Sequence, residues 1–151
     1  MTATNHAITG AVIAVTFSSP WLALPAALLS HFVLDAVPHW DYQLKLAAKR
    51  AVMAGDLLLA AIIILAVAFF AGTFNAPVWV IVACGALAVV PDAMWLPHIL
   101  RGRPIPMGDD RPLYYARRFH RWIQWSETKR LGILTESVWL AAMVIILFQS
   151  K

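Results

Sequence analysis

Residues 57–70 read LLLAAIIILAVAFF, an unbroken apolar run that follows the acidic residue Asp56. As a helix, the apolar stretch 56–74 comes close to the roughly 20 residues that cross a hydrocarbon core of about 30 Å. Further apolar stretches occupy 7–18, 20–37, 76–96 and 132–148. The last two also approach the spanning length, whereas 7–18 is too short to cross alone at about 1.5 Å per residue.

The composition is that of a membrane protein. Of the 151 residues, 61% are hydrophobic and 13% are charged, and the mean hydropathy is +0.71. Soluble domains have roughly 45–50% apolar and about 25% charged residues. We therefore expect one all-α transmembrane domain over residues 1–151, a small integral membrane bundle of about five helices. The single cysteine, Cys84, excludes a disulfide framework and a cysteine-rich zinc site.

Turn-forming residues divide the apolar stretches. Ser18, Ser19 and Pro20 predict a tight helical hairpin over 7–37, whose first helix is short or re-entrant. No Lys or Arg precedes this hairpin, so we expect it to belong to the fold rather than to a cleaved signal peptide. A second turn is expected at 73–77. The segment 97–112, with four prolines and two glycines, predicts a loop.

The segment 113–125 has the pattern of an amphipathic helix within a basic region, 97–131. Its aromatic and polar residues fall on different faces, Tyr115, Phe119 and Trp122 against Arg117, Arg121 and Gln124. Tyrosine, tryptophan and arginine together are typical of a helix that lies in the headgroup plane. The alternative is an ordinary surface helix of a soluble domain.

Threading the helices alternately through a bilayer gathers the polar residues on one side. All five histidines, all eight acidic residues and eleven of the twelve Lys and Arg residues fall there, with Lys151 as the exception. The positive-inside rule makes that side cytoplasmic. We therefore expect a multi-pass protein whose N-terminus and polar cluster are cytoplasmic. If 7–37 were one long helix, His6 would move to the opposite side.

The candidate site begins in the stretch His31-Phe-Val-Leu-Asp35-Ala-Val-Pro38-His39. His31 and Asp35 are four residues apart and share a helix face. His39 follows just past Pro38, which stops the helix. Burying one such group alone in an apolar segment is costly, and intramembrane ionisable residues are usually functional. An isolated helical ion pair of His31 with Asp35 is the alternative.

Other polar residues are expected at the same membrane face. Asp92 follows Pro91 at a helix end, where the helix dipole disfavours a carboxylate, so it needs a cation or a metal as partner. Asp56 is either a ligand or a helix cap, and His6 is either a ligand or an exposed terminal histidine. His120 and Glu136 are candidate catalytic acid–base groups, although Glu136 is equally explained as an interfacial carboxylate.

Mixed imidazole and carboxylate ligands suit zinc, manganese or iron better than calcium or magnesium. The predicted set is larger than one tetrahedral ion requires and indicates one or more divalent ions, zinc first: His6, His31, Asp35, His39, Asp56 and Asp92. Such ions lower the pKa of a bound water and polarise phosphoryl oxygens.

Guanidinium groups match phosphate geometry. The predicted substrate-binding residues are Arg117, Arg118 and Arg121. Membrane topology alone also explains basic loops of this kind. No nucleic-acid-binding module accompanies the basic residues, so no nucleic-acid partner is expected.

Several short motifs resemble a known family when taken in order. They are Asn5-His6-Ala7-Ile8-Thr9-Gly10, His31-x3-Asp35-x2-Pro38-His39, Pro91-Asp92 and His120-Arg121. This order resembles the bacterial membrane-bound metal-dependent hydrolases, which are small inner-membrane proteins. The His-x3-Asp step also resembles the ligand run of zinc-dependent phospholipases C. The resemblance implies a metal-dependent hydrolase in the bacterial inner membrane.

Two departures from these patterns bear on catalysis. A second histidine commonly follows the His-Arg pair in the family, whereas this chain has Gln124 and Trp125 there. The aspartate that precedes the His-x3-Asp step in the phospholipases has no counterpart here. A site that lacks one ligand binds fewer metals or has lost catalysis.

Two function hypotheses follow. The first is a metal-dependent hydrolase of phosphoester bonds that acts on a phospholipid or lipid-linked phosphate at the cytoplasmic membrane surface. The second is a non-catalytic membrane accessory subunit or assembly protein with a protein partner in the membrane, in which the same groups form a structural network or a closed metal site.

Overall fold

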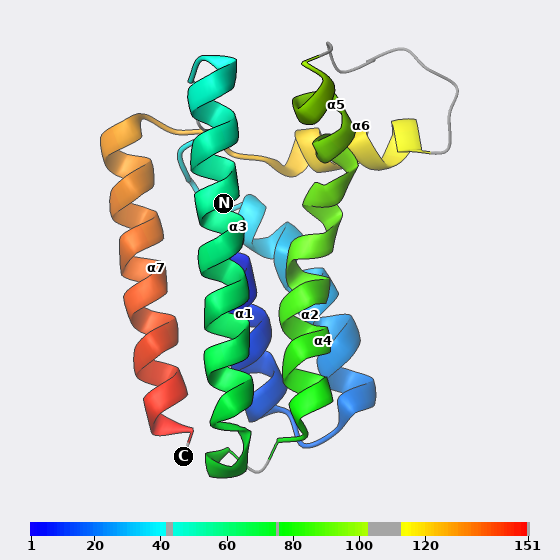
Figure 1. Ribbon diagram of the computed structural model, residues 1–151, viewed down its shortest axis with the longest axis vertical. Coiled ribbons are helices and arrows are strands. Elements are labelled where there is room, and N and C mark those ends of the chain that lie inside the picture. The colour runs from blue at the N-terminus through cyan, green and yellow to red at the C-terminus, as the bar shows by residue number, and fades with distance from the viewer. Residues whose placement is uncertain (42–43, 75, 103–112, 151) are drawn as a thin grey trace.

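The structure, a computed structural model, describes residues 1–41, 44–74, 76–102 and 113–150, and the described chain is all-α (Figure 1). Two 3₁₀ turns, η1 (Ala71–Thr73) and η2 (Val90–Trp95), precede and follow the fourth helix. The α-helices are α1 (Ala3–Thr16), α2 (Pro20–Asp35), α3 (Leu46–Phe69), α4 (Val78–Val89), α5 (Leu96–Arg101), α6 (Leu113–Ile123) and α7 (Lys129–Gln149).

Three helical stretches are long and apolar enough to cross a membrane. They are Leu46–Phe69, Val78–Arg101 and Lys129–Gln149, and α2 is a shorter apolar helix. Large apolar side chains such as Leu65, Phe69 and Leu134 are exposed on their outer surfaces. Three of the expected apolar stretches are thus confirmed as helices of spanning length.

The shortest of the expected membrane helices, α1, lies at the centre of the bundle. Its 14 residues rise about 21 Å, and all residues from Ala3 to Val12 are buried. Figure 1 shows α1 and α2 as an antiparallel hairpin, with α1 covered by α3 in that view. The hairpin predicted over 7–37 is therefore present, and its short first helix is the core of the bundle rather than its edge.

Two side chains fix the start of α1 at Ala3, four residues before the predicted apolar stretch. The Thr2 hydroxyl accepts a hydrogen bond from Asn5 N. From α3, the Asp56 carboxylate accepts from Ala3 N at 2.7 Å and from Thr4 N at 3.0 Å. The first N–H groups of a helix have no partner within the helix, and a carboxylate there is favoured by the dipole. Asp56 thereby joins α3 to the buried end of α1.

The predicted loop 97–112 is wrong in its first part, because Leu96–Arg101 forms α5. Pro97 lies in the first turn of this helix, where a missing N–H costs nothing. The helix ends at Gly102, whose φ of 64° is the left-handed conformation that glycine adopts readily. The rest of that prediction, 103–112, lies outside the described residues.

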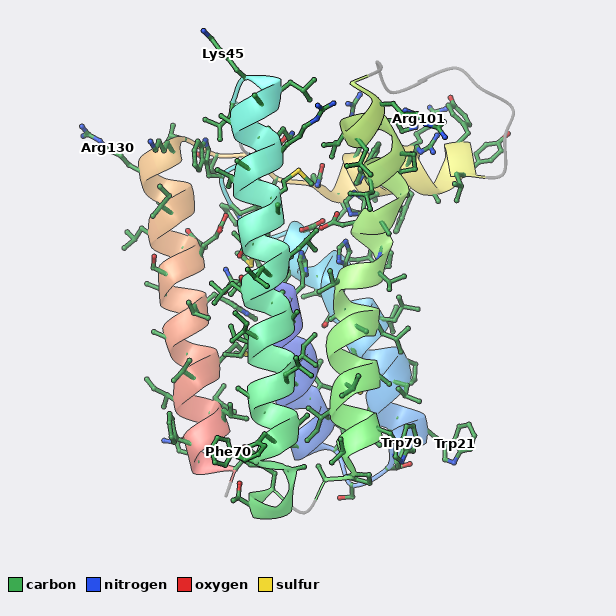
Figure 2. All side chains as sticks on the ribbon, viewed as in Figure 1. Trp21, Lys45, Phe70, Trp79, Arg101 and Arg130 are labelled. Atoms are coloured by element: carbon green, nitrogen blue, oxygen red, sulfur yellow. The ribbon has the colours of Figure 1, made fainter. Side chains whose placement is uncertain are left out.

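Three charged side chains mark one end of the bundle. Figure 2 shows Lys45, Arg101 and Arg130 at one end, and Trp21, Phe70 and Trp79 at the other. The helix α6 runs across the long helices near the charged end (Figure 1). The predicted amphipathic helix is thus present at 113–123.

Replacing Gly10 by alanine is expected to destabilise the protein. A Cβ at Gly10 would overlap the backbone carbonyl of Cys84, so α1 would have to move away from α4. Overpacking of this kind costs about 1–3 kcal/mol. The control is Gly55→Ala in α3, where nothing lies within 4 Å of the added Cβ and the exchange should gain roughly 0.5–1 kcal/mol. Thermal unfolding in detergent measures both, and equal effects would contradict the close α1–α4 contact.

Candidate metal centre

Four side chains from three parts of the chain form a group that could hold a metal ion. His31 and Asp35 come from the last turns of α2, Asp92 from η2 and His120 from α6. One ligand atom of each lies within 4.8 Å of the others. His31 and Asp35 share a helix face because they are four residues apart.

The distances within this group are close to those around a tetrahedral ion. His31 Nε2 lies 2.8 Å from His120 Nε2, 3.4 Å from Asp35 Oδ2 and 3.8 Å from Asp92 Oδ1. His120 Nε2 lies 3.0 Å from Asp35 Oδ2 and 3.5 Å from Asp92 Oδ1. Ligands about 2.0–2.2 Å from a tetrahedral ion lie roughly 3.3–3.6 Å from one another. The separations in the group fall on either side of that range.

The ring orientation of His31 is fixed from outside the group. Its Nδ1 lies 2.8 Å from the carbonyl oxygen of Ala88 and donates to it. Ala88 is in the last turn of α4, where carbonyl groups have no partner within the helix. In a neutral imidazole with the proton on Nδ1, Nε2 carries a lone pair. A hydrogen bond of this kind commonly orients metal-binding histidines.

The Asp35 carboxylate has one oxygen that the described residues leave unsatisfied. Asp35 is 1% exposed, and its Oδ2 has no hydrogen-bond partner among the described residues, although two imidazole nitrogens lie within 3.4 Å. A buried acceptor without a donor is costly. A cation between Oδ2, His31 Nε2 and His120 Nε2 would satisfy Oδ2 and would replace the hydrogen bond between the two imidazole nitrogens. The residues present therefore fit a divalent ion.

The other Asp35 oxygen, Oδ1, is directed toward α1. The amino group of Met1 donates to it, and His6 Nε2 lies 3.2 Å away. The His6 ring also stacks on that of His31, with centroids 4.2 Å apart. His6, a predicted ligand, thus contacts two members of the four-residue group, Asp35 and His31, but is not itself one of the four.

Two kinds of contact place α6 so that His120 reaches the group: aromatic rings pack against its side chains, and a backbone hydrogen bond fixes the chain just after its C-terminal end. Its imidazole packs on Trp95, with centroids 5.6 Å apart, and Phe119 packs on Phe32 at 5.7 Å. Beyond the helix, Trp125 N donates to the carbonyl of Asp35 at 3.0 Å. The backbone that follows α6 is thus hydrogen-bonded directly to Asp35, a member of the group.

The remaining predicted ligands and catalytic residues lie elsewhere. His39 Nδ1 donates to the carbonyl of Val37 at 2.8 Å, and the His39 backbone pairs with the 125–127 segment. Asp56 caps α1. Glu136, on α7, accepts from Trp40 N at 3.3 Å through its carboxylate. The structure thus brings together His31, Asp35 and Asp92 of the predicted ligands and adds His120, which the sequence predicted as a catalytic group.

The three predicted arginines differ in their surroundings. Arg117 is buried on the same side of α6 as His120, whereas Arg118 and Arg121 are exposed. Arg118 lines a shallow depression on the outer side of α6 together with the exposed rings of Tyr115, Phe119 and Trp122. Some polar side chains of α6 therefore point into the bundle, whereas its aromatic side chains point outward.

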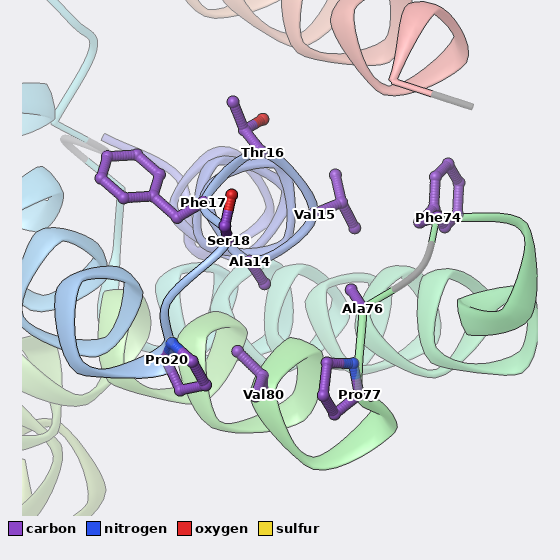
Figure 3. A pocket seen from close by; sticks show the side chains of 10 residues that line it. All are labelled: Ala14, Val15, Thr16, Phe17, Ser18, Pro20, Phe74, Ala76, Pro77 and Val80. Carbon is purple, nitrogen blue, oxygen red and sulfur yellow. The ribbon is translucent and has the colours of Figure 1, made fainter.

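The group opens toward the outside at Asp92. The Asp92 side chain is 31% exposed, whereas the other three side chains are at most 1% exposed. A pocket of about 320 Å³ lies near the turns that join α1 to α2 and η1 to α4 (Figure 3). Its described lining has no titratable side chain. The side chains that could bind a metal or a substrate therefore lie at the Asp92 side of the protein and not in that pocket.

Acid is expected to destabilise the protein partly through His39. Burial lowers the pKa of His39 below its ordinary value of 6.5. The unfolded chain therefore binds a proton at a higher pH than the folded chain does, so stability falls as the pH drops below about 6.5. One such histidine contributes a slope of up to about 1.4 kcal/mol per pH unit. Unfolding measured from pH 7.5 to 5 should show a shallower slope for His39→Gln, and an unchanged slope would contradict the prediction.

Comparisons of the chain with protein-family models, with curated proteins and with solved structures found no match. The resemblance to the membrane-bound metal-dependent hydrolases thus stays a prediction.

Proposed function

We propose that the protein binds a divalent metal ion through His31, Asp35, Asp92 and His120. The observation that carries the proposal is the unsatisfied Asp35 Oδ2, which is buried and faces the Nε2 atoms of His31 and His120. Two imidazole nitrogens with two carboxylate oxygens suit zinc, and also manganese or iron.

We further propose that this centre hydrolyses a phosphoester of a phospholipid or lipid-linked phosphate. A divalent ion supplies an activated water and polarises a phosphoryl oxygen when it is bound. The exposed edge at Asp92 supports this reaction, because a catalytic site keeps an open position. The basic residues at the same end of the bundle favour an anionic substrate (Figure 2).

A membrane location supports a lipid as the substrate. The three spanning-length helices expose apolar side chains along their outer surfaces, which lipid tails would cover. The positive-inside rule assigns the charged end to the cytoplasmic side. The proposed enzyme is therefore a multi-pass protein of the bacterial inner membrane with its site near the cytoplasmic surface.

One observation favours a non-catalytic alternative. The Asp35 Oδ1 atom already contacts the Met1 amino group and His6, so part of the charge is neutralised without a metal. In this second function the polar groups form a structural network or a closed metal site in an accessory protein that binds a membrane partner.

Metal analysis tests the first proposal. The purified protein should take up about one zinc ion per chain. His120→Ala should weaken zinc binding by more than the roughly 10–100-fold that the loss of an outer hydrogen-bond partner costs. His98→Ala is the matched control, because His98 is a histidine on α5 outside the four-residue group. Stoichiometric zinc that survives both His31→Ala and Asp35→Ala would refute the proposed centre.

The open position is tested with Co²⁺ in place of zinc. A catalytic centre should change its visible spectrum when an exogenous ligand such as azide is added, because one coordination position is open. A closed structural centre should give an unchanged spectrum. The same protein is then assayed for release of phosphate or headgroup from phospholipid vesicles. Asp92→Asn should abolish turnover, and an active Asp92→Asn protein would exclude this residue from the reaction.

A further inference from the structure

Arg117 is a buried cation next to the proposed metal centre. It is 9% exposed, although its neighbours Arg118 and Arg121 on the same helix are exposed. Arg117 and His120 are three residues apart and therefore share one face of α6. His120 is fully buried and belongs to the metal-binding group. The chain thus directs one of its arginines inward on the same face as a proposed ligand.

The hydrogen bonds of Arg117 are incomplete among the described residues. Its Nη2 donates to the carbonyl of Met94 over a long 3.5 Å, and its Nε has no partner. No carboxylate in the described part of the chain lies within ion-pair distance of it. A guanidinium carries five donors and keeps its charge. Burying that charge without an anion is strongly unfavourable.

Arg117 contacts the segment that carries the exposed member of the group. Met94, which accepts its hydrogen bond, is two residues after Asp92 in η2. Asp92 is the member of the metal-binding group that is partly exposed. Arg117 therefore contacts the same short 3₁₀ segment that carries the exposed ligand, one turn or less from Asp92 along the chain.

We propose that Arg117 binds an oxyanion of the ligand, a phosphate group, and holds it beside the metal centre; this inference rests on the proposed function and identifies its anion-binding residue. The planar fork of a guanidinium matches two oxygens of a phosphate. The anion supplies the negative charge that the described residues do not. Arg118 and Arg121 lie on the exposed side of α6 and take no part.

The experiment measures phosphate binding by calorimetry. The zinc-loaded full chain in a neutral detergent, freed of unbound zinc, is titrated with inorganic phosphate and with a short-chain phosphatidic acid. Arg117→Gln should weaken binding about 10–100-fold, the range for a hydrogen-bonded charged group. Arg117→Lys should give an intermediate loss, because lysine keeps the charge but not the fork. Arg130→Gln, at the same end of the bundle but on α7, is the matched control and should change the affinity less than about twofold.

Arg118→Gln decides between the buried and the exposed arginine. An equal loss in Arg118→Gln and Arg117→Gln, or no loss in Arg117→Gln, would overturn the inference. If Arg117→Gln does not fold, as judged by circular dichroism, Arg117→Lys is compared with Arg118→Lys, and equal affinities would overturn it. Tighter binding of phosphatidic acid than of inorganic phosphate identifies a lipid headgroup as the ligand, and equal binding identifies free phosphate.

The metal is assayed separately, so the two proposals can fail separately. If the wild-type protein takes up no zinc, the proposed function fails. Phosphate binding by the zinc-free protein that is still weakened by Arg117→Gln would then support the anion site by itself, and binding that does not depend on Arg117 would refute it.

Discussion

The buried carboxylate of Asp35 is the constraint on which the arrangement of the helices depends. A charge removed from water is stable only if it is paired or hydrogen-bonded. Asp35 Oδ1 obtains these contacts from the Met1 amino group and from His6 on α1, whereas Oδ2 faces His31 on α2 and His120 on α6, with which it would share the proposed cation. Each contact brings a separate element to the same place. The polar centre therefore sets how the ends of these elements meet, and apolar packing covers the length of the bundle below it.

Sequence reasoning succeeded where one physical signal dominates. Continuous apolar runs predicted the long helices, and the four-residue spacing of His31 and Asp35 predicted their shared face. It left open whether Asp56 is a metal ligand or a helix cap, because a capping carboxylate and a metal ligand can have the same local sequence. The partner of that carboxylate lies more than fifty residues away in the chain, at Ala3 and Thr4. Only the docking of α1 against α3 distinguishes the two roles.

His120 illustrates a different limit. It is separated from His31 by 89 residues, and its local sequence reads as part of an amphipathic helix. In a soluble protein the aromatic face of such a helix would be buried. Here Tyr115 and Trp122 are 74% and 80% exposed, whereas Arg117 and His120 are buried. α6 thus turns two of its polar side chains inward and leaves Arg118 and Arg121 exposed. A membrane around the bundle, as proposed, would account for the exposed aromatic rings, because charged groups then find partners in the polar interior.

The inward direction of Arg117 and His120 also bears on why the centre lies at one end of the bundle. A polar cluster halfway along the bundle would be cut off from water and from charged ligands. A cluster on the outer surface would be in contact with water and would not need to be buried by α1 and α6. The four-residue group is enclosed on the sides of α1, α2 and α6 and is exposed only through Asp92. The proposed reaction on a lipid requires this opening to lie at the depth of the lipid phosphates. Under the proposed function, the burial that the Asp35 charge demands and the access that a lipid-borne substrate requires would both be met at a single position, the end of the bundle where α6 crosses it.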